Sequence, residues 1–174
     1  MDLPEPFKPA EEKDIPALEI LVNSAYRGET SKAGWTTEAD LLDGIRTDQQ
    51  GLREMIEKPG AIILTYRNEE NTLQGCVYLE QQKQVMYLGM LTILPTLQGK
   101  GLGRQMMKVA EDYARSKGCV AVEMTVISAR HELIAWYEKN DYQPTGEKKP
   151  FPNDPRFGIP KRPLEFIVMR KELN

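Results

Sequence analysis

The stretch that decides the fold of this chain is residues 91–106, which read LTILPTLQGKGLGRQM. An apolar strand ends at Pro95, and three alternate glycines then lead directly into a helix. Glycine reaches backbone conformations closed to other residues and lets a ligand approach the main chain closely. The first amides of a helix have no partner within the helix, so they form a positively polarised site for anions. The stretch therefore predicts an anion-binding loop at a helix N-terminus.

The charge around this loop is positive, although the chain as a whole is acidic. Lys100, Arg104 and Lys108 lie at or near the predicted helix N-terminus, whereas the formal net charge of the chain is -3. No Asp or Glu occurs between Glu80 and Glu111. We therefore expect the loop to receive an anionic ligand.

The spacing of the glycines decides between kinds of anion-binding loop. A Walker loop needs Ser or Thr after its lysine, where this chain has Gly101. A dinucleotide fingerprint needs a third glycine where this chain has Arg104. The remaining pattern, Gln98-x-x-Gly101-x-Gly103, resembles the pyrophosphate loop of the GCN5-related N-acetyltransferase (GNAT) superfamily. The alternative is a helix N-terminus whose glycines only make a tight turn.

The composition indicates a single domain spanning residues 1–174, long enough to bury a sizeable core. The acidic balance argues against a nucleic-acid partner. The N-terminal residues lack the charged and apolar regions of a signal peptide. No apolar run approaches the length of about 20 residues that spans a bilayer. We therefore expect a cytoplasmic protein without a nucleic-acid or membrane partner.

The two cysteines, Cys76 and Cys119, lie in apolar, strand-like surroundings. Neither belongs to a CxxC or Cys/His pattern, so we interpret both as small core residues in a reducing compartment and expect no metal. Neither has a histidine or a helix N-terminus nearby in sequence that would lower the pKa of its thiol. We therefore expect neither cysteine to be a nucleophile.

The hydrophobic periodicity predicts a mixed order of helices and strands. The expected elements are an edge strand at 6–10, a helix from Asp14 as its cap to Gly28, a helix opening at 37–42, a further turn or two at 51–58, strands at 61–66, 73–80 and 85–93, a helix at 102–117, a strand at 120–126, a helix at 130–140, and strands at 142–149 and 164–171. A strand, a helix and a strand in succession imply a right-handed crossover and a parallel pair.

A proline-rich loop at 150–160 joins the last two predicted strands. A loop this long and stiff inside a compact domain is more often functional than idle. The loop contains the aromatic and stiff residues Phe151, Pro152 and Phe157. We expect it either to cap the cleft that binds the amine acceptor of the reaction described below or to form the contact of a homodimer.

Two further segments strengthen the resemblance to the GNAT superfamily. Residues 92–95 resemble its bulged fourth strand, and residues 135–142, AWYEKNDY, resemble its late-helix signature. The order of elements is similar over nearly the whole chain. The resemblance implies an α/β (α+β) fold with a mixed, mostly antiparallel sheet flanked by helices and a splayed parallel strand pair at the CoA site.

The resemblance also implies acetyl-CoA as the acyl donor. The amides from Gly99 to Arg104 would hold the pyrophosphate, Gln98 would brace the turn, and the main chain of Leu91 and Ile93 would pair with the pantetheine arm. The expected cofactor-binding residues are Leu91, Thr92, Ile93, Gln98, Gly99, Lys100, Gly101, Leu102, Gly103 and Arg104. Leu102 is expected to fill the core more than to touch the ligand.

Direct acetyl transfer requires a neutral amine, polarisation of the thioester carbonyl and a proton for the departing thiolate. Main-chain amides around 91–93 could polarise the carbonyl. Tyr137 matches the tyrosine that hydrogen-bonds or protonates the leaving sulfur in the family, and the alternative for it is a core aromatic.

The general base stays open, because residues 85–90 lack the glutamate that many family members carry on this strand. Tyr87 lies in the right region, although a phenol with a pKa near 10 is a poor base at neutral pH. Glu123 and His131 are further candidates. The preferred interpretation of Glu123 is a strand carboxylate that faces polar neighbours, and that of His131 is a solvated residue in the first turn of its helix. A water chain, or an acceptor that arrives neutral, would also suffice.

The acceptor is expected to be a small primary amine, bound near the ends of the first two predicted helices. The expected substrate-binding residues are Tyr26, Arg27, Trp35, Tyr87 and Arg130. Arg27 and Arg130 could hold a carboxylate in bidentate fashion, which favours an amino-acid-like acceptor, or they could be surface ion-pair partners. A non-catalytic acyl-CoA-binding module and an enzyme that modifies protein lysines or N-termini are the alternative functions.

Overall fold

A computed structural model describes residues 1–174, apart from the side chain of Phe157. The helices are α1 (Ile15–Tyr26), α2 (Gly28–Ser31), α3 (Gln49–Glu57), α4 (Leu102–Ser116) and α5 (His131–Lys139), with 3-10 turns η1 (Glu12–Asp14), η2 (Pro95–Leu97) and η3 (Pro155–Phe157). The strands are β1 (Phe7–Pro9), β2 (Leu42–Asp43), β3 (Ala61–Arg67), β4 (Leu73–Gln82), β5 (Val85–Ile93), β6 (Ala121–Ile127), β7 (Gln143–Pro150), β8 (Ile159–Pro160) and β9 (Glu165–Glu172).

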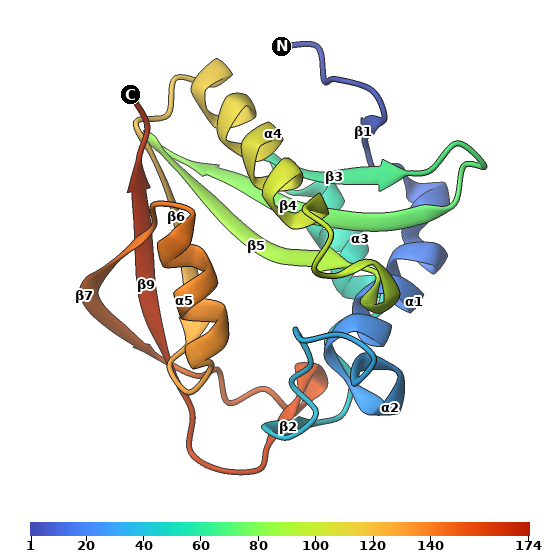
Figure 1. Ribbon diagram of the computed structural model, residues 1–174, viewed down its shortest axis with the longest axis vertical. Coiled ribbons are helices and arrows are strands. Elements are labelled where there is room, and N and C mark those ends of the chain that lie inside the picture. Colours follow the sequence, from blue (N-terminus) through green and yellow to red (C-terminus); the bar gives the residue numbers. More distant parts are fainter.

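The main sheet has seven strands in the order β1-β3-β4-β5-β6-β9-β7 (Figure 1). All neighbouring strands are antiparallel except β5 and β6, which are parallel and joined through α4. This confirms the predicted fold class, the parallel pair and the edge position of the first strand. Every described helix is too short or too polar to cross a membrane.

The parallel pair separates because β5 bends at a β-bulge. Pairing with β6 covers only Val85–Tyr87, and the two strands diverge beyond it (Figure 1). On the β4 side, the register shifts between Cys76 and Tyr78, and Met90 has a positive φ of 54°. An extra residue in one strand increases its local twist and bends it. The bulge therefore opens the sheet between the ends of β5 and β6.

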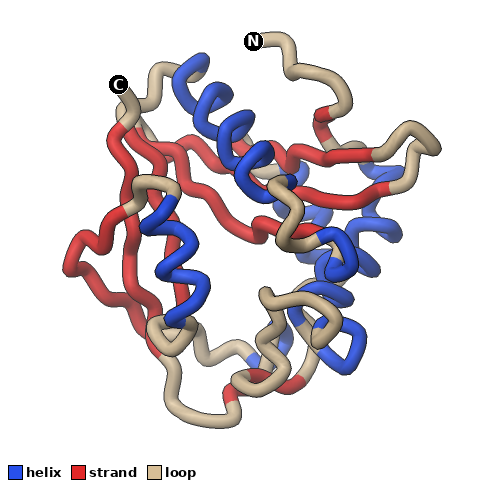
Figure 2. Tube along the Cα trace, in the orientation of Figure 1, coloured by secondary structure: helices blue, strands red, loops and turns tan.

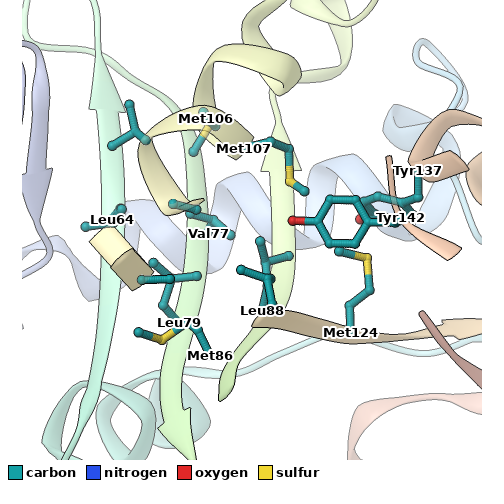
Figure 3. Packing of buried hydrophobic residues seen from close by; sticks show 14 of the residues in the cluster. Leu64, Val77, Leu79, Met86, Leu88, Met106, Met107, Met124, Tyr137 and Tyr142 are labelled. Atoms are coloured by element: carbon teal, nitrogen blue, oxygen red, sulfur yellow. The ribbon is translucent and has the colours of Figure 1, made fainter. Parts of the chain in front are cut away.

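Helices cover both faces of the sheet, and alternation along the strands sends side chains to each side. On β3, Leu64 joins the core under α4 and α5, whereas the adjacent Ile63 joins the core under α1 and α3. Figure 3 shows the first of these cores, to which β4 contributes Val77 and Leu79 and α4 contributes Met106. The result is a sheet held between two helical layers.

The helix predicted to open at 37–42 is wrong. Leu42 instead pairs with Pro160 in a short second sheet formed by β2 and β8, and it is buried there. The hydroxyl of Thr37 accepts a hydrogen bond from the amide of Ala39, which favours a turn over a helix. The segment before α3 is therefore a loop that meets the proline-rich loop between β7 and β9 (Figures 1 and 2).

The ends of the first and third helices also differ from the prediction. Asp14 stands at the N-cap position of α1, but its side chain makes no capping bond there. Its carboxylate accepts from the amide of Glu11 and pairs with Arg67 at 2.7 Å. The helix predicted from 51 begins at Gln49, where Asp48 supplies the cap by accepting from the amide of Gly51.

Candidate active site

Two cavities meet along the C-terminal half of β5. The first, about 390 Å³, lies against the glycine loop before α4 and is called here the donor cavity. The second, about 350 Å³, reaches Tyr87 on one side and the proline-rich loop on the other and is called the acceptor cavity. The residues common to both are Tyr26, Leu91, Arg130, Leu133 and Tyr137. A group held in one cavity can therefore contact a group held in the other.

The glycine loop has the backbone geometry that the sequence predicts. Gly99 and Gly101 have positive φ values of 81° and 87°, and Gly101 is the N-cap residue of α4. No side chain caps this helix, so its first amides are available to a ligand. A Cβ on Gly103 would lie 3.2 Å from the ring of Trp136 across the cavity. The loop therefore suits an anionic group close to the main chain.

Most of the predicted cofactor-binding residues line the donor cavity, and three do not. The lining includes Leu91, Ile93, Gln98, Gly99, Gly101, Gly103 and Arg104. Lys100 is exposed outside this lining, and Leu102 packs against the core. Thr92 is buried, and its hydroxyl donates to the carbonyl of Met90 at 2.9 Å, so its side chain stabilises the bulge. Lys108 lies beyond the cavity and pairs with Asp112.

Gln98 ties the glycine loop to two other segments. Its Oε1 accepts from the amides of Trp35 and Thr36 at 2.7 and 3.2 Å. Its Nε2 donates to the hydroxyl of Thr36 at 2.7 Å and to the carbonyl of Ile93 at 3.0 Å. Gln98 thus braces the turn, as predicted, and also fixes residues 34–36 as one wall of the donor cavity.

The open edge of β5 faces the point where the two cavities meet. The Tyr26 hydroxyl donates to the carbonyl of Leu91, and the carbonyl of Ile93 accepts from Gln98. Both carbonyls thus already accept a hydrogen bond from a side chain. Leu91 and Ile93 on this edge line the donor cavity, so a ligand in that cavity can contact the main chain of β5.

Tyr137 is both a core aromatic and a cavity residue. It is 6% exposed and packs edge-to-face on Trp136 and Tyr142, with ring centroids 5.2 and 5.9 Å away. Burial raises the pKa of Tyr137 well above its usual value, with a smaller contribution from Tyr26. At neutral pH its hydroxyl is therefore protonated and can donate a hydrogen bond into either cavity.

The three candidates for a general base occupy different places. Tyr87 lines the acceptor cavity. Glu123 forms an ion pair with Arg170 at 3.0 Å, and His131 is exposed at the start of α5. Among the described residues, neither Glu123 nor His131 belongs to the lining of the two cavities.

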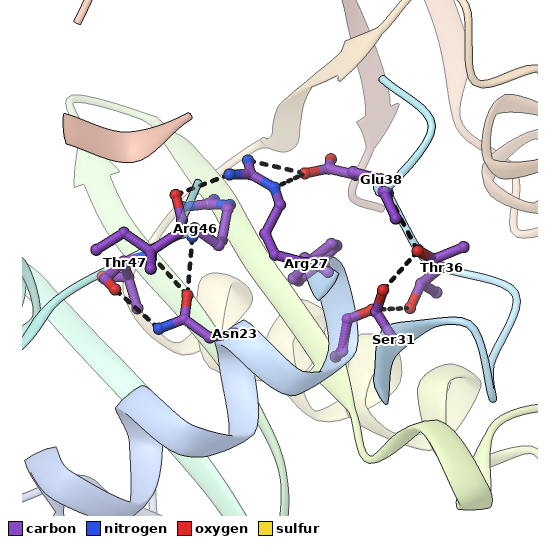
Figure 4. Close-up of polar contacts among 12 residues, drawn as sticks. Asn23, Arg27, Ser31, Thr36, Glu38, Arg46 and Thr47 are labelled. Carbon is purple, nitrogen blue, oxygen red and sulfur yellow. Dashed lines mark hydrogen bonds and ion pairs between the residues drawn. The ribbon is translucent and has the colours of Figure 1, made fainter. Parts of the chain in front are cut away.

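Arg27 and Arg130 do hold a carboxylate, but that carboxylate belongs to Glu38 of the chain itself. Arg27 donates to Glu38 Oε1 from Nε and Nη2 at 3.2 and 3.1 Å (Figure 4). Arg130 lies 3.3 Å from Glu38 Oε2 and donates to the carbonyl of Thr36 at 2.6 Å. The ion pairs are buried, whereas the alternative expected them on the surface, and both arginines border the acceptor cavity, so their binding of an acceptor stays a prediction.

Two wall residues were missed by the sequence interpretation. Trp136 faces Trp35 across the donor cavity, with ring centroids 6.2 Å apart. Glu38 was interpreted only as part of a helix start, and no sequence signal connects it to Arg130, which lies 92 positions away.

The order of strands, the bulge and the glycine loop agree with the family comparison. The chain matches the model of the Acetyltransferase (GNAT) family over residues 29–142. The chain belongs to this family. A curated relative, acetyltransferase Atu2258 from Agrobacterium fabrum (strain C58), is 22% identical over 87 residues, which are 50% of this chain. The match covers 62% of that GNAT relative, so the chain spans less than two thirds of its length.

Solved structures show the same GNAT fold. Ribosomal-protein-alanine N-acetyltransferase from Brucella melitensis has a TM-score of 0.70 at 19% identity, covering 96% of this chain and 99% of that chain. The structure of yncA from Salmonella typhimurium with its cofactor acetyl-CoA has a TM-score of 0.68 at 19% identity, covering 100% of this chain and 95% of that chain.

The glycine loop gives a first prediction. Gly101→Val should abolish the thermal stabilisation that CoA gives the parent protein, about 2.7 kcal/mol at 100 times the dissociation constant. A side chain at this position would block the approach of the pyrophosphate to the main chain. Gly146→Val on the exposed strand β7 is a matched control, because Gly146 has a similar φ of 91° and open surroundings. A parental CoA-induced shift in Gly101→Val would contradict the loop assignment.

The cysteines give a second prediction. Burial raises the pKa of Cys76 to about 12 and also raises the pKa of Cys119, so both thiols stay protonated at neutral pH. The double variant Cys76→Ser/Cys119→Ser should keep the turnover of the parent and lose only some stability. The protein is incubated with acetyl-CoA without an acceptor and then quenched, and mass spectrometry should reveal no thioester on either cysteine. An acetyl group trapped on either cysteine would rule out direct transfer.

Proposed function

We propose that this chain transfers an acetyl group from acetyl-CoA directly to the primary amine of a small acceptor. The observation that carries the proposal is the junction of the donor and acceptor cavities at Tyr26, Leu91 and Tyr137. Direct transfer needs the thioester carbon and the amine nitrogen in contact, and two cavities sharing one wall provide that arrangement.

The donor would enter with its pyrophosphate on the loop at the start of α4. Gly99 and Gly101 leave the main chain accessible, and Arg104 adds a positive charge to the cavity lining. The pantetheine arm would then follow the open edge of β5 at Leu91 and Ile93. Anion binding by uncapped helix amides supports the placement of the pyrophosphate, and the divergence of β6 from β5 beyond Tyr87 supports the placement of the arm.

In the reaction, the amine nitrogen attacks the thioester carbon, the C–S bond breaks, and the proton lost by the amine ends on the thiolate. Main-chain amides at the bulge of β5 would stabilise the oxyanion. A thiol ionises near pH 8.5, below the raised pKa of Tyr137. Tyr137 would therefore stabilise the leaving thiolate chiefly by donating a hydrogen bond to sulfur.

In the acceptor cavity, the amine would either arrive neutral or lose its proton to water. Tyr87 is the base candidate that borders the acceptor cavity. Glu38 also borders it, but both oxygens of its carboxylate already accept hydrogen bonds from guanidinium groups.

An acceptor screen tests the proposal. The protein is incubated with acetyl-CoA and separate panels of small amines, amino acids and peptides with free N-termini, and thiol release is followed. Turnover with a small amine or amino acid supports the proposal. Turnover with peptides alone would favour a protein-modifying enzyme, and tight CoA binding without turnover would favour an acyl-CoA-binding module.

A further inference from the structure

The acceptor cavity combines apolar walls with an excess of positive charge. Leu88, Met124, Val126, Phe151 and Phe166 contribute apolar surface. Arg27, Arg46 and Arg130 border the same cavity, together with the carboxylates Glu38 and Asp154. Phe151 packs on Phe166 with ring centroids 5.2 Å apart, so the proline-rich loop supplies part of the apolar wall.

The internal ion pairs leave this charge uncompensated. Arg27 and Arg130 share the single carboxylate of Glu38. Asp154 accepts from the amide of Arg156 and lies 3.9 Å from the side chain of Arg156. Among the described residues, Arg46 is thus the arginine of this cavity for which no ion pair with a carboxylate is found.

Arg46 itself has no carboxylate partner among the described side chains. Its guanidinium lies over the ring of Tyr26, 5.8 Å from the centroid. Glu54 borders a small surface groove beside Arg46, but it accepts a hydrogen bond from Gln50 and forms no ion pair with Arg46. The guanidinium therefore keeps its hydrogen-bond donors for a ligand.

The backbone under Arg46 is held in place by α1. Asn23 Oδ1 accepts from the amides of Arg46 and Thr47 at 2.8 and 3.0 Å, and Asn23 Nδ2 donates to the carbonyl of Thr47 at 2.9 Å (Figure 4). The side chain then rests on Tyr26, whose hydroxyl reaches Leu91 at the junction of the two cavities. Arg46 is thus a positioned cation next to the place of transfer.

We infer that Arg46 binds a carboxylate of the acceptor, which is an amino acid with an apolar side chain. The guanidinium fork matches a carboxylate in bidentate geometry, and the apolar walls take the side chain. The inference rests on the proposed function, because it names the acceptor of the same reaction.

The test compares phenylalanine with 2-phenylethylamine, which differ only in the carboxylate. In Arg46→Gln, kcat/KM for phenylalanine should fall about 10- to 100-fold, the range expected for a lost hydrogen-bonded ion pair. The value for 2-phenylethylamine and the CoA-induced thermal shift should stay unchanged. Arg53→Gln is the matched control, because Arg53 pairs with Glu12 on the outer side of α3 and borders neither cavity among the described residues.

An equal loss for both acceptors, or no loss for phenylalanine, would overturn the inference. If the parent acetylates no amine, the proposed function fails, and Arg46 is then tested by the binding of N-acetylphenylalanine measured by calorimetry. Weaker binding to Arg46→Gln than to Arg53→Gln supports the carboxylate site, whereas equal binding rejects it.

Discussion

Tyr137→Phe should lower kcat about 10²- to 10³-fold, the range for removing one hydrogen-bond donor to a developing anion, and leave the melting temperature and CoA affinity nearly unchanged. The substitution removes the hydroxyl that would hydrogen-bond to the leaving sulfur. It keeps the ring, so the contacts with Trp136 and Tyr142 remain. Steady-state turnover, calorimetric unfolding and CoA titration on the same preparation separate these effects.

Tyr142→Phe is the matched control for this variant. Tyr142 belongs to the same aromatic cluster, but its hydroxyl donates to Glu111 at 2.9 Å, and Glu111 also accepts from Lys171. Losing that bond should cost about 1 kcal/mol of unfolding free energy and leave kcat unchanged. Parental turnover in Tyr137→Phe would reduce Tyr137 to a core aromatic.

The leaving group provides a second measurement on the same residue. A thioester whose thiolate is a better leaving group needs less stabilisation at sulfur. The ratio of kcat between the parent and Tyr137→Phe should therefore shrink with such a donor. A ratio independent of the leaving group would assign Tyr137 a role elsewhere in the reaction.

Glu38→Ala should destabilise the fold by about 3–5 kcal/mol, because it leaves two guanidinium groups buried without their carboxylate. The side chains of Arg27, Arg130 and Glu38 are only 6%, 8% and 9% exposed. The variant should also loosen the acceptor cavity, since the Arg130 side chain then keeps only the carbonyl of Thr36 as a hydrogen-bond partner among the described residues. Urea unfolding monitored by tryptophan fluorescence measures the free-energy change.

Glu29→Ala is the control for an ordinary ion pair. Glu29 pairs with Lys32 at 3.0 Å, but its side chain is 89% exposed. Solvent screens such a pair, so the variant should change the unfolding free energy by less than about 0.5 kcal/mol. A loss below about 1 kcal/mol in Glu38→Ala would mean that the two arginines find other partners or water.

The sequence by itself determined the framework of the donor site. The glycine spacing at 99–103 predicted positive φ values and an open helix N-terminus, and both are present. Short apolar runs bounded by turn residues predicted β3, β4 and β5, and the strand–helix–strand order predicted the parallel pair of β5 and β6. These features depend on residues that are close in sequence, so local periodicity and backbone preference were enough to predict them.

The tertiary structure alone decided the acceptor side. Arg130 meets Glu38 across 92 positions of sequence, and β2 meets β8 across more than a hundred. Those contacts replaced the helix expected at 37–42 with a loop, assigned Arg27 to an internal ion pair and left Arg46 at the acceptor cavity without a carboxylate partner among the described residues. No local pattern encodes such choices, because a charged side chain pairs with whichever partner the fold brings within a few ångströms.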